Sequence, residues 1–113
     1  MTAIPLIPLL ENGERRIVPA LFEMGQLSIT PAAEEVADEH GIDLFDLLIR
    51  HLSGDWGDQY DDGKQLNDAA IENGYRILSM YGNPDGDERI WIHTLGTTNG
   101  RRLATCIMTP SDY

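Results

Sequence analysis

Hydrophobic and polar residues alternate along the C-terminal third of the chain, a period-two pattern that predicts β-strands with one buried face. Three runs rich in β-branched and aromatic residues span 75–81, 88–95 and 101–109, and Gly, Pro, Asn or Asp residues bound each run. Because their connections are short, neighbouring strands are expected to be antiparallel. The sequence therefore predicts a three-stranded meander, and such a sheet needs a second layer to bury a face.

The same alternation assigns side chains to the two faces of the predicted sheet. In the middle strand, Ile90, Ile92 and Thr94 share one face, and Trp91 lies on the other. Cys106 lies in the middle of the third strand, so we expect a small buried residue there. No catalytic signature lies on these strands, which are interpreted as a scaffold.

Helical periodicity over residues 30–73 predicts the second layer. Thr30 and Pro31 provide a capping hydroxyl and a proline at the first helical position, so a first helix is expected over 30–41. Further helices are predicted over 43–53, where an aspartate is the cap, and more weakly over 61–73. The third helix has these expected apolar positions: Leu66, Ala69, Ala70 and Ile71.

The N-terminal region is the part that the pattern determines least. Three prolines interrupt any regular element there: Pro5, Pro8 and Pro19. Asn12-Gly13 between two apolar runs is typical of a small hairpin, but we interpret 16–22 as an irregular extended segment. A short strand over 26–29 leads into the first helix. The prediction is an irregular N-terminal extension over 1–23 and a single α+β domain over 24–113, with two or three short helices packed on a three-stranded antiparallel β-meander.

Negative charge is concentrated in the helical region. The net charge is −11, and residues 34–72 contain 12 acidic and two basic residues, or −10 of that total. Such a surface repels nucleic acid and attracts a basic protein surface, so direct nucleic-acid binding is not expected. The exposed candidates for partner binding are Glu34, Glu35, Asp38, Glu39, Asp58, Asp61 and Asp62. Four arginines give the strands a mildly basic character: Arg76, Arg89, Arg101 and Arg102.

The cellular location is predicted from the absence of paired cysteines, of a membrane span and of a secretion signal in the sequence. A lone cysteine cannot form an internal disulfide or a thiolate metal cluster. No apolar run approaches the roughly 18 residues of a membrane span, and the apolar N-terminal run has no basic region before it. These features predict a cytoplasmic protein.

One short stretch combines residue types that enzymes use. The residues of this motif are His51, Ser53, Gly54, Asp55, Trp56 and Gly57. A hydrolase needs a nucleophile, a base and an orienting group within hydrogen-bond reach, but no nucleophile-elbow pattern flanks Ser53. In the structural interpretation, the positive form of His51 is favoured at a helix C-terminus, Ser53-Gly54 ends the helix, and Trp56 packs the loop onto the core.

Metal and cofactor sites are not predicted. The three histidines lie on three different elements, without the spacing of a zinc site: His40, His51 and His93. Four aspartates over 55–62 lack the residue order of a calcium loop, and no glycine-rich phosphate loop is present. The sequence therefore predicts no metal ion, no cofactor and no catalytic residue.

Several segments match a known group of small proteins: Gly25-Gln26, Thr30-Pro31-Ala32, the runs over 50–57, 74–79 and 88–92, and in the ending Ala104-Thr105, Met108-Thr109-Pro110 and Tyr113. Over 24–113 the chain resembles the plasmid-related proteins carried on plasmids and integrative elements of proteobacteria, and the H-x-S-G-D-W-G stretch is the most specific element. The chain departs from that family at 93–96, where an acidic turn is usual. The resemblance implies a mobile-element setting and no established activity.

Two classes of function follow. The first is a small acidic accessory protein, a non-enzymatic protein-binding module that inhibits a host defence complex of the anti-CRISPR or anti-restriction type by nucleic-acid mimicry. The alternative is an enzyme or nucleic-acid-processing accessory that uses His51, Asp55 and Trp56. A simpler explanation of the charge is solubility, with a binding partner of another kind.

Overall fold

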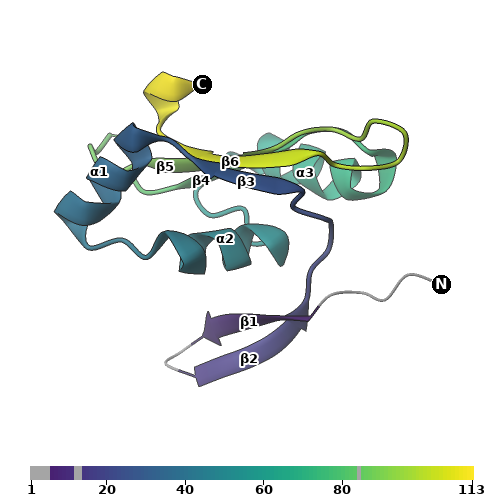
Figure 1. Cartoon of the computed structure of the whole chain (residues 1–113), viewed down its shortest axis with the longest axis horizontal. Coiled ribbons are helices and arrows are strands. Elements are labelled where there is room, and N and C mark those ends of the chain that lie inside the picture. Colours follow the sequence, from purple (N-terminus) through teal and green to yellow (C-terminus); the bar gives the residue numbers. More distant parts are fainter. Residues whose placement is uncertain (1–5, 12–13, 84) are drawn as a thin grey trace.

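A computed structural model describes residues 6–11, 14–83 and 85–113 of the chain, and its fold is α+β (Figure 1). The strands are β1 (Leu6–Glu11), β2 (Glu14–Pro19), β3 (Gln26–Ile29), β4 (Ile77–Tyr81), β5 (Ile90–Thr94) and β6 (Ala104–Met108). The helices are α1 (Pro31–His40), α2 (Leu44–Leu52), α3 (Asp61–Asn73) and a short 3-10 helix, η1 (Pro110–Asp112). In the residues described, no helix has the length and apolar character needed to cross a membrane.

The main sheet has four strands in the order β3-β6-β5-β4. The predicted antiparallel pairing of β4 with β5 and of β5 with β6 is confirmed. The prediction was incomplete because β3 joins β6 as a parallel neighbour, so the sheet is mixed. Backbone bonds at both ends hold this pair, from Gln26 N–H to the Leu103 carbonyl and from Thr30 N–H to the Ile107 carbonyl, each 2.9 Å long.

The N-terminal segment forms a separate two-stranded antiparallel sheet. The interpretation of 16–22 as irregular was wrong up to residue 19, and the hairpin alternative describes this segment. Asn12-Gly13, the predicted turn, lies outside the described residues. Ile7 on β1 packs against the core cluster, so burial of apolar side chains stabilises a hairpin that would be marginal alone.

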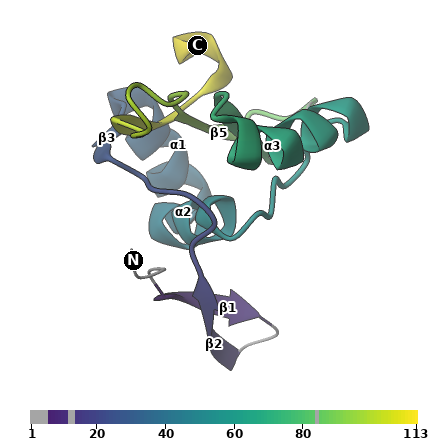
Figure 2. The same cartoon turned by 90° about the vertical axis from the view of Figure 1, so that its right-hand side faces the viewer.

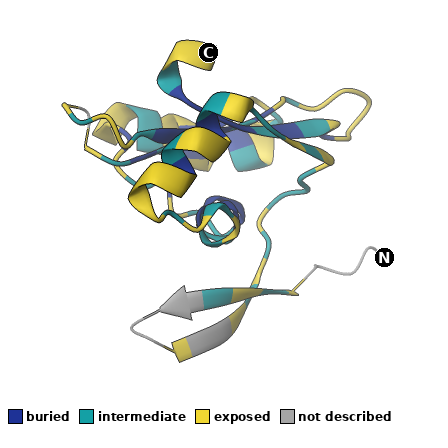
Figure 3. Ribbon diagram, turned by 60° about the vertical axis from the view of Figure 1, so that its left-hand side comes forward, coloured by how far each residue is buried: buried dark blue, intermediate teal, exposed yellow. Residues whose placement is uncertain are grey.

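The elements are arranged in layers. Both Figure 1 and Figure 2 place α2 between the main sheet and the β1–β2 hairpin, with η1 on the opposite side of the sheet. α1 lies near the β3 end of the sheet, and α3 lies beside β4. Figure 3 shows buried residues gathered along the sheet and on α2. As alternation predicts, Ile90, Ile92 and Thr94 are fully buried on the face toward α2, whereas Cys106, expected to be buried, is only half-buried on the other face.

Side-chain caps fix where the first two helices begin, as predicted. The Thr30 hydroxyl accepts a bond from Ala33 N–H at 3.1 Å, and the Asp43 carboxylate accepts bonds from Phe45 N–H and Asp46 N–H. Glycines in the left-handed region follow α1 and α3, with φ of 65° at position 41 and 76° at position 74. Local sequence chemistry therefore determines these boundaries.

The buried face of α3 differs from the prediction. Leu66, expected in the core, is 70% exposed, and Asn67 is buried in its place. The Asn67 amide donates to the Leu78 carbonyl at 2.7 Å and accepts from Leu78 N–H at 3.1 Å. β4 is an edge strand, and the Asn67 side chain satisfies backbone groups that a further strand would otherwise bond.

We predict opposite outcomes for alanine at these two neighbouring positions. Asn67→Ala leaves Leu78 N–H buried without a partner and should lower the free energy of unfolding by about 1–3 kcal/mol. Leu66→Ala should change it by less than about 0.5 kcal/mol, because the side chain is mostly in solvent. Urea unfolding of both variants measures the difference, and equal losses would contradict this assignment.

Candidate functional site

The motif histidine lies at the centre of a buried chain of hydrogen bonds. His51 is fully buried, and its ring contacts the Ser79 hydroxyl at 2.6 Å through Nδ1 and the Thr94 hydroxyl at 2.9 Å through Nε2. Thr94 in turn lies 2.7 Å from the Thr105 hydroxyl, which donates to the Met24 carbonyl at 2.8 Å. The chain thus connects α2 with β4, β5, β6 and the segment before β3.

The last acceptor fixes the direction of the bonds from the Met24 carbonyl back to His51 Nε2. The Thr105 proton goes to the Met24 carbonyl, so the Thr105 oxygen accepts from Thr94. The Thr94 oxygen then accepts a hydrogen bond from His51 Nε2–H. In the neutral ring, Nδ1 accepts from the Ser79 hydroxyl, so all polar atoms of His51 are satisfied.

The surroundings of His51 oppose a positive charge. Burial, together with smaller contributions from the nearby His93 and Arg102, lowers the pKa of His51 to about 3. The rings of Phe22 and Trp56 pack against the imidazole, with centroids 5.2 and 6.1 Å away. The expected stabilisation of a charged His51 by the helix C-terminus is therefore wrong, because desolvation outweighs the helix dipole.

The hydrolase arrangement considered from the sequence is not formed. The Ser53 hydroxyl donates to the Arg50 carbonyl at 3.0 Å and belongs to the end of α2. The serine that meets His51 is Ser79, which is also fully buried. Since neither partner reaches the surface, this pair is a structural contact of the core in this conformation.

The loop after α2 closes the open edge of β4. Met80 N–H donates to the Trp56 carbonyl at 3.2 Å, and Asp58 N–H donates to the Met80 carbonyl at 2.6 Å. The Asp58 carboxylate also accepts a bond from Gly82 N–H at 2.8 Å. Residues 56–58 thus act as a short parallel strand, and Asn67 continues the same protection along β4.

The other motif residues hold this loop in place. Trp56 is 4% exposed, as predicted, and its indole N–H donates to the Asp68 carboxylate at 2.8 Å. Gly57 has φ of 68°, and a Cβ there would collide with the Met80 carbonyl, so glycine is required. The Asp55 carboxylate accepts from Arg50 Nε at 2.7 Å, and this bond and one from Gly57 N–H lower its pKa although burial acts to raise it.

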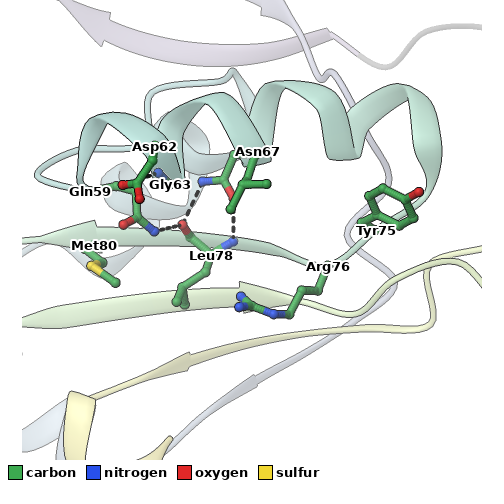
Figure 4. A pocket seen from close by; sticks show the side chains of 9 residues that line it. Gln59, Asp62, Gly63, Asn67, Tyr75, Arg76, Leu78 and Met80 are labelled. Carbon is green, nitrogen blue, oxygen red and sulfur yellow. Dashed lines mark hydrogen bonds between the residues drawn. The ribbon is translucent and has the colours of Figure 1, made fainter.

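A groove of about 400 Å³ lies between α3 and the outer side of β4. Figure 4 shows the side chains that line it. Leu66 and Tyr75 line it and are largely exposed, and Met80 is half-buried. Asp62 lies toward one end of the groove and Arg76 toward the other. The groove therefore offers apolar surface between two opposite charges.

The amide side chains in this groove already form hydrogen bonds with the protein backbone. Gln59 Nε2 donates to the Leu78 carbonyl at 3.0 Å, and Gln59 Oε1 accepts from Tyr60 N–H. Asn67 bonds the same Leu78 backbone (Figure 4). The roles of Gln59 and Asn67 were not predicted from the sequence. A stripe of small or amide residues does recur there at helical spacing: Gly63, Asn67, Ala70 and Gly74.

The seven acidic candidates are all exposed, but they do not form one surface. Four of them constitute what we call the acidic α1 face: Glu34, Glu35, Asp38 and Glu39. Asp61 and Asp62 begin α3, where a helix dipole stabilises negative charge, and Asp58 bonds Gly82. Figures 1 and 2 show α1 and α3 on separate sides of the molecule.

The strands also expose less free positive charge than the sequence predicted. Arg102 is 4% exposed, and its guanidinium donates to three carbonyls, of Ala70, Tyr75 and Leu95. Arg101 Nε lies 3.0 Å from the Glu23 carboxylate, and this bond lowers the pKa of Glu23. Among the described residues, no group of three or more metal-ligating side chains is close enough to hold an ion.

We predict that acid destabilises the protein through His51. Its pKa in the folded state is below the unfolded value of 6.5, so its contribution is complete above pH 6.5 and declines as pH falls toward 3. In urea unfolding between pH 6 and 5, the stability of the His51→Gln protein should depend on pH less steeply than wild type, by about 1 kcal/mol per unit. Equal slopes would show that His51 is open to water. His93, whose pKa is also lowered by burial, contributes in both proteins.

Comparison of the chain with protein-family models, with curated proteins and with solved structures finds no match. The resemblance to plasmid-related proteins therefore stays a prediction from the sequence. The roles given above depend only on the residues of this chain and their contacts.

Proposed function

We propose that this chain is a non-enzymatic binding module whose acidic α1 face docks on a basic surface of a partner protein. One observation carries the proposal: the four carboxylates of this face are exposed, and none of them lies within ion-pair distance of a cation in the described part of the chain. Uncompensated charge of one sign attracts a surface of the opposite sign and speeds encounter with it.

The spacing of these carboxylates supports mimicry of nucleic acid. Their positions i, i+1, i+4 and i+5 place them within about 140° of the helix circumference. At 1.5 Å per residue, four charges occupy about 7.5 Å of helix, or roughly one per 2 Å, close to the one per 1.7 Å of duplex DNA. A protein surface that binds phosphates is therefore the partner class that this face fits.

Room for partner side chains exists beside the charges. Glu35 and Glu39 line a hollow of about 340 Å³ together with Val36, Arg89 and Pro110. A lysine or arginine that enters this hollow would meet the carboxylates of Glu35 and Glu39 with its charged end and Val36 and Pro110 with its methylene stem. The positive charge of Arg89, which lines the same hollow, weakens this attraction. The predicted mobile-element setting favours a host defence complex that binds nucleic acid as the source of such a surface.

The proposed binding surface has fewer acidic residues than the sequence predicted, because the remaining three candidates have other positions or contacts in the fold. Asp58 is bonded to the backbone of Gly82, and Asp61 and Asp62 lie at the start of α3. The enzyme alternative has no comparable support, because His51 and Ser79 are buried and Asp55 is bonded to Arg50.

Capture of host proteins on the immobilised chain tests the proposal. The triple variant Glu35→Lys, Asp38→Lys and Glu39→Lys should lose at least tenfold in partner capture while it folds normally, since exposed helix positions tolerate such changes. The matched control is Glu14→Lys, Asp61→Lys and Glu72→Lys, which changes the net charge equally at exposed sites away from α1.

Salt and DNA distinguish mimicry from other binding. Capture by the wild-type chain should fall steeply between 0.05 and 0.5 M salt, because charge attraction is screened over about 8–10 Å near physiological ionic strength. Added duplex DNA should compete for the same partner. Capture that is insensitive to salt, to DNA and to the α1 reversals would contradict the proposal.

A further inference from the structure

The β1–β2 hairpin carries apolar side chains on both of its faces. On the inner face, Ile7 pairs with Val18, and Ile7 packs against the core cluster near α2. Of the side chains that the structure describes, the outer face carries two adjacent cross-strand pairs, Leu6 with Pro19 and Pro8 with Ile17. Leu6 is 67% exposed and Ile17 is 65% exposed, and both prolines are exposed as well. A two-stranded sheet with an uncovered apolar face is incomplete as a layered structure.

The prolines restrict how this hairpin can associate. Two residues connect β1 to β2, so Glu11 and Glu14 form a hydrogen-bonded pair, and such pairs alternate along the ladder. Pro8 and Pro19 therefore belong to non-hydrogen-bonded pairs, and their nitrogens face the free edges of the two strands. A proline there removes a donor that an added strand would need. Association through an edge is disfavoured, which leaves the outer face.

Charge distribution indicates what covers this face. Residues 1–22 contain two acidic and two basic residues and have no net charge, whereas residues 23–113 have 17 acidic and six basic residues and carry the whole −11. A second copy of such an acidic chain is repelled almost everywhere, and least at the hairpin. A basic partner, by contrast, is attracted to the acidic α1 face.

We propose that a second copy of this chain covers the outer face of the hairpin, with the two hairpins packed face to face across a two-fold axis. In such an isologous contact, Leu6 and Ile17 of one copy meet the same residues of the other. The face points away from α2 and the main sheet (Figures 1 and 2), so the acidic α1 face stays accessible in the dimer. The dimer presents two acidic faces, and it does not depend on the function proposed above.

The size of the patch sets the strength of the contact. Four side chains supply only part of the roughly 800 Å² per partner that a standard stable interface buries. The dimer is therefore expected to dissociate reversibly with a constant on the order of micromolar or weaker. Added salt should strengthen it, because salt screens the repulsion between the two acidic copies and leaves the apolar contact intact.

Analytical ultracentrifugation of the full chain tests this dimer. Between about 5 and 500 µM in 0.15 M NaCl, the average mass should rise from that of a monomer toward twice that value, and it should rise at lower concentration in 0.5 M NaCl. The double variant Leu6→Lys and Ile17→Lys should stay monomeric throughout. Its circular dichroism and melting temperature should match wild type, since both side chains are exposed.

The matched control is Leu66→Lys and Leu103→Lys, which adds the same charge at leucines that are 70% and 57% exposed elsewhere. This control should dimerise at least as well as wild type. A wild-type chain that is monomeric at every concentration and salt level would overturn the proposal. So would a dimer that survives the hairpin substitutions or that is lost equally in the control.

Discussion

The buried hydrogen-bond chain through His51 is the interaction on which the rest of this fold depends. It links α2 to three strands of the sheet, and each hydroxyl and ring nitrogen in it has a hydrogen-bond partner. A buried polar group that loses its hydrogen-bond partner lowers the stability of the fold by about 1–3 kcal/mol. A shift or rotation of α2 would break several of these hydrogen bonds at once. The position of α2 then fixes where residues 53–59 begin. That loop is what closes the edge of β4.

Much of this fold is readable from local sequence chemistry. The caps at Thr30 and Asp43 and the alternation through Ile90, Ile92 and Thr94 act over a few residues, so the helix starts and the meander were predictable. The pairing of β3 with β6 joins segments 78 positions apart in register and leaves no periodic signal. The hairpin was hard to predict because prolines usually interrupt strands. Pro8 and Pro19 are tolerated because they occupy positions whose backbone nitrogen forms no hydrogen bond between β1 and β2.

The motif was recognised as a unit, but its chemistry could not be predicted from spacing. Ser79 and Thr94, the partners of His51, lie 28 and 43 residues away in sequence, and only the fold brings them together. Sequence position suggested a charged histidine at a helix end, whereas burial keeps it neutral. Similarly, Arg102 looked like part of a basic surface and is instead a buried donor to three carbonyls. Burial is a property of the whole chain, so local rules could not reveal these roles.

The motif residue His51 thus belongs to the polar core and not to the exposed surfaces available for binding. The central claim is that His51 is a neutral group of the core that solvent does not reach, and NMR of its ring nitrogens tests this directly. With nitrogen-15 in the histidine rings, long-range nitrogen–proton spectra should show one ring proton, on Nε2, and no change between pH 7.5 and 5. A ring that gains a second proton near pH 6.5, or carries its proton on Nδ1, would contradict the claim and return the motif to the candidates for solvent-accessible chemistry.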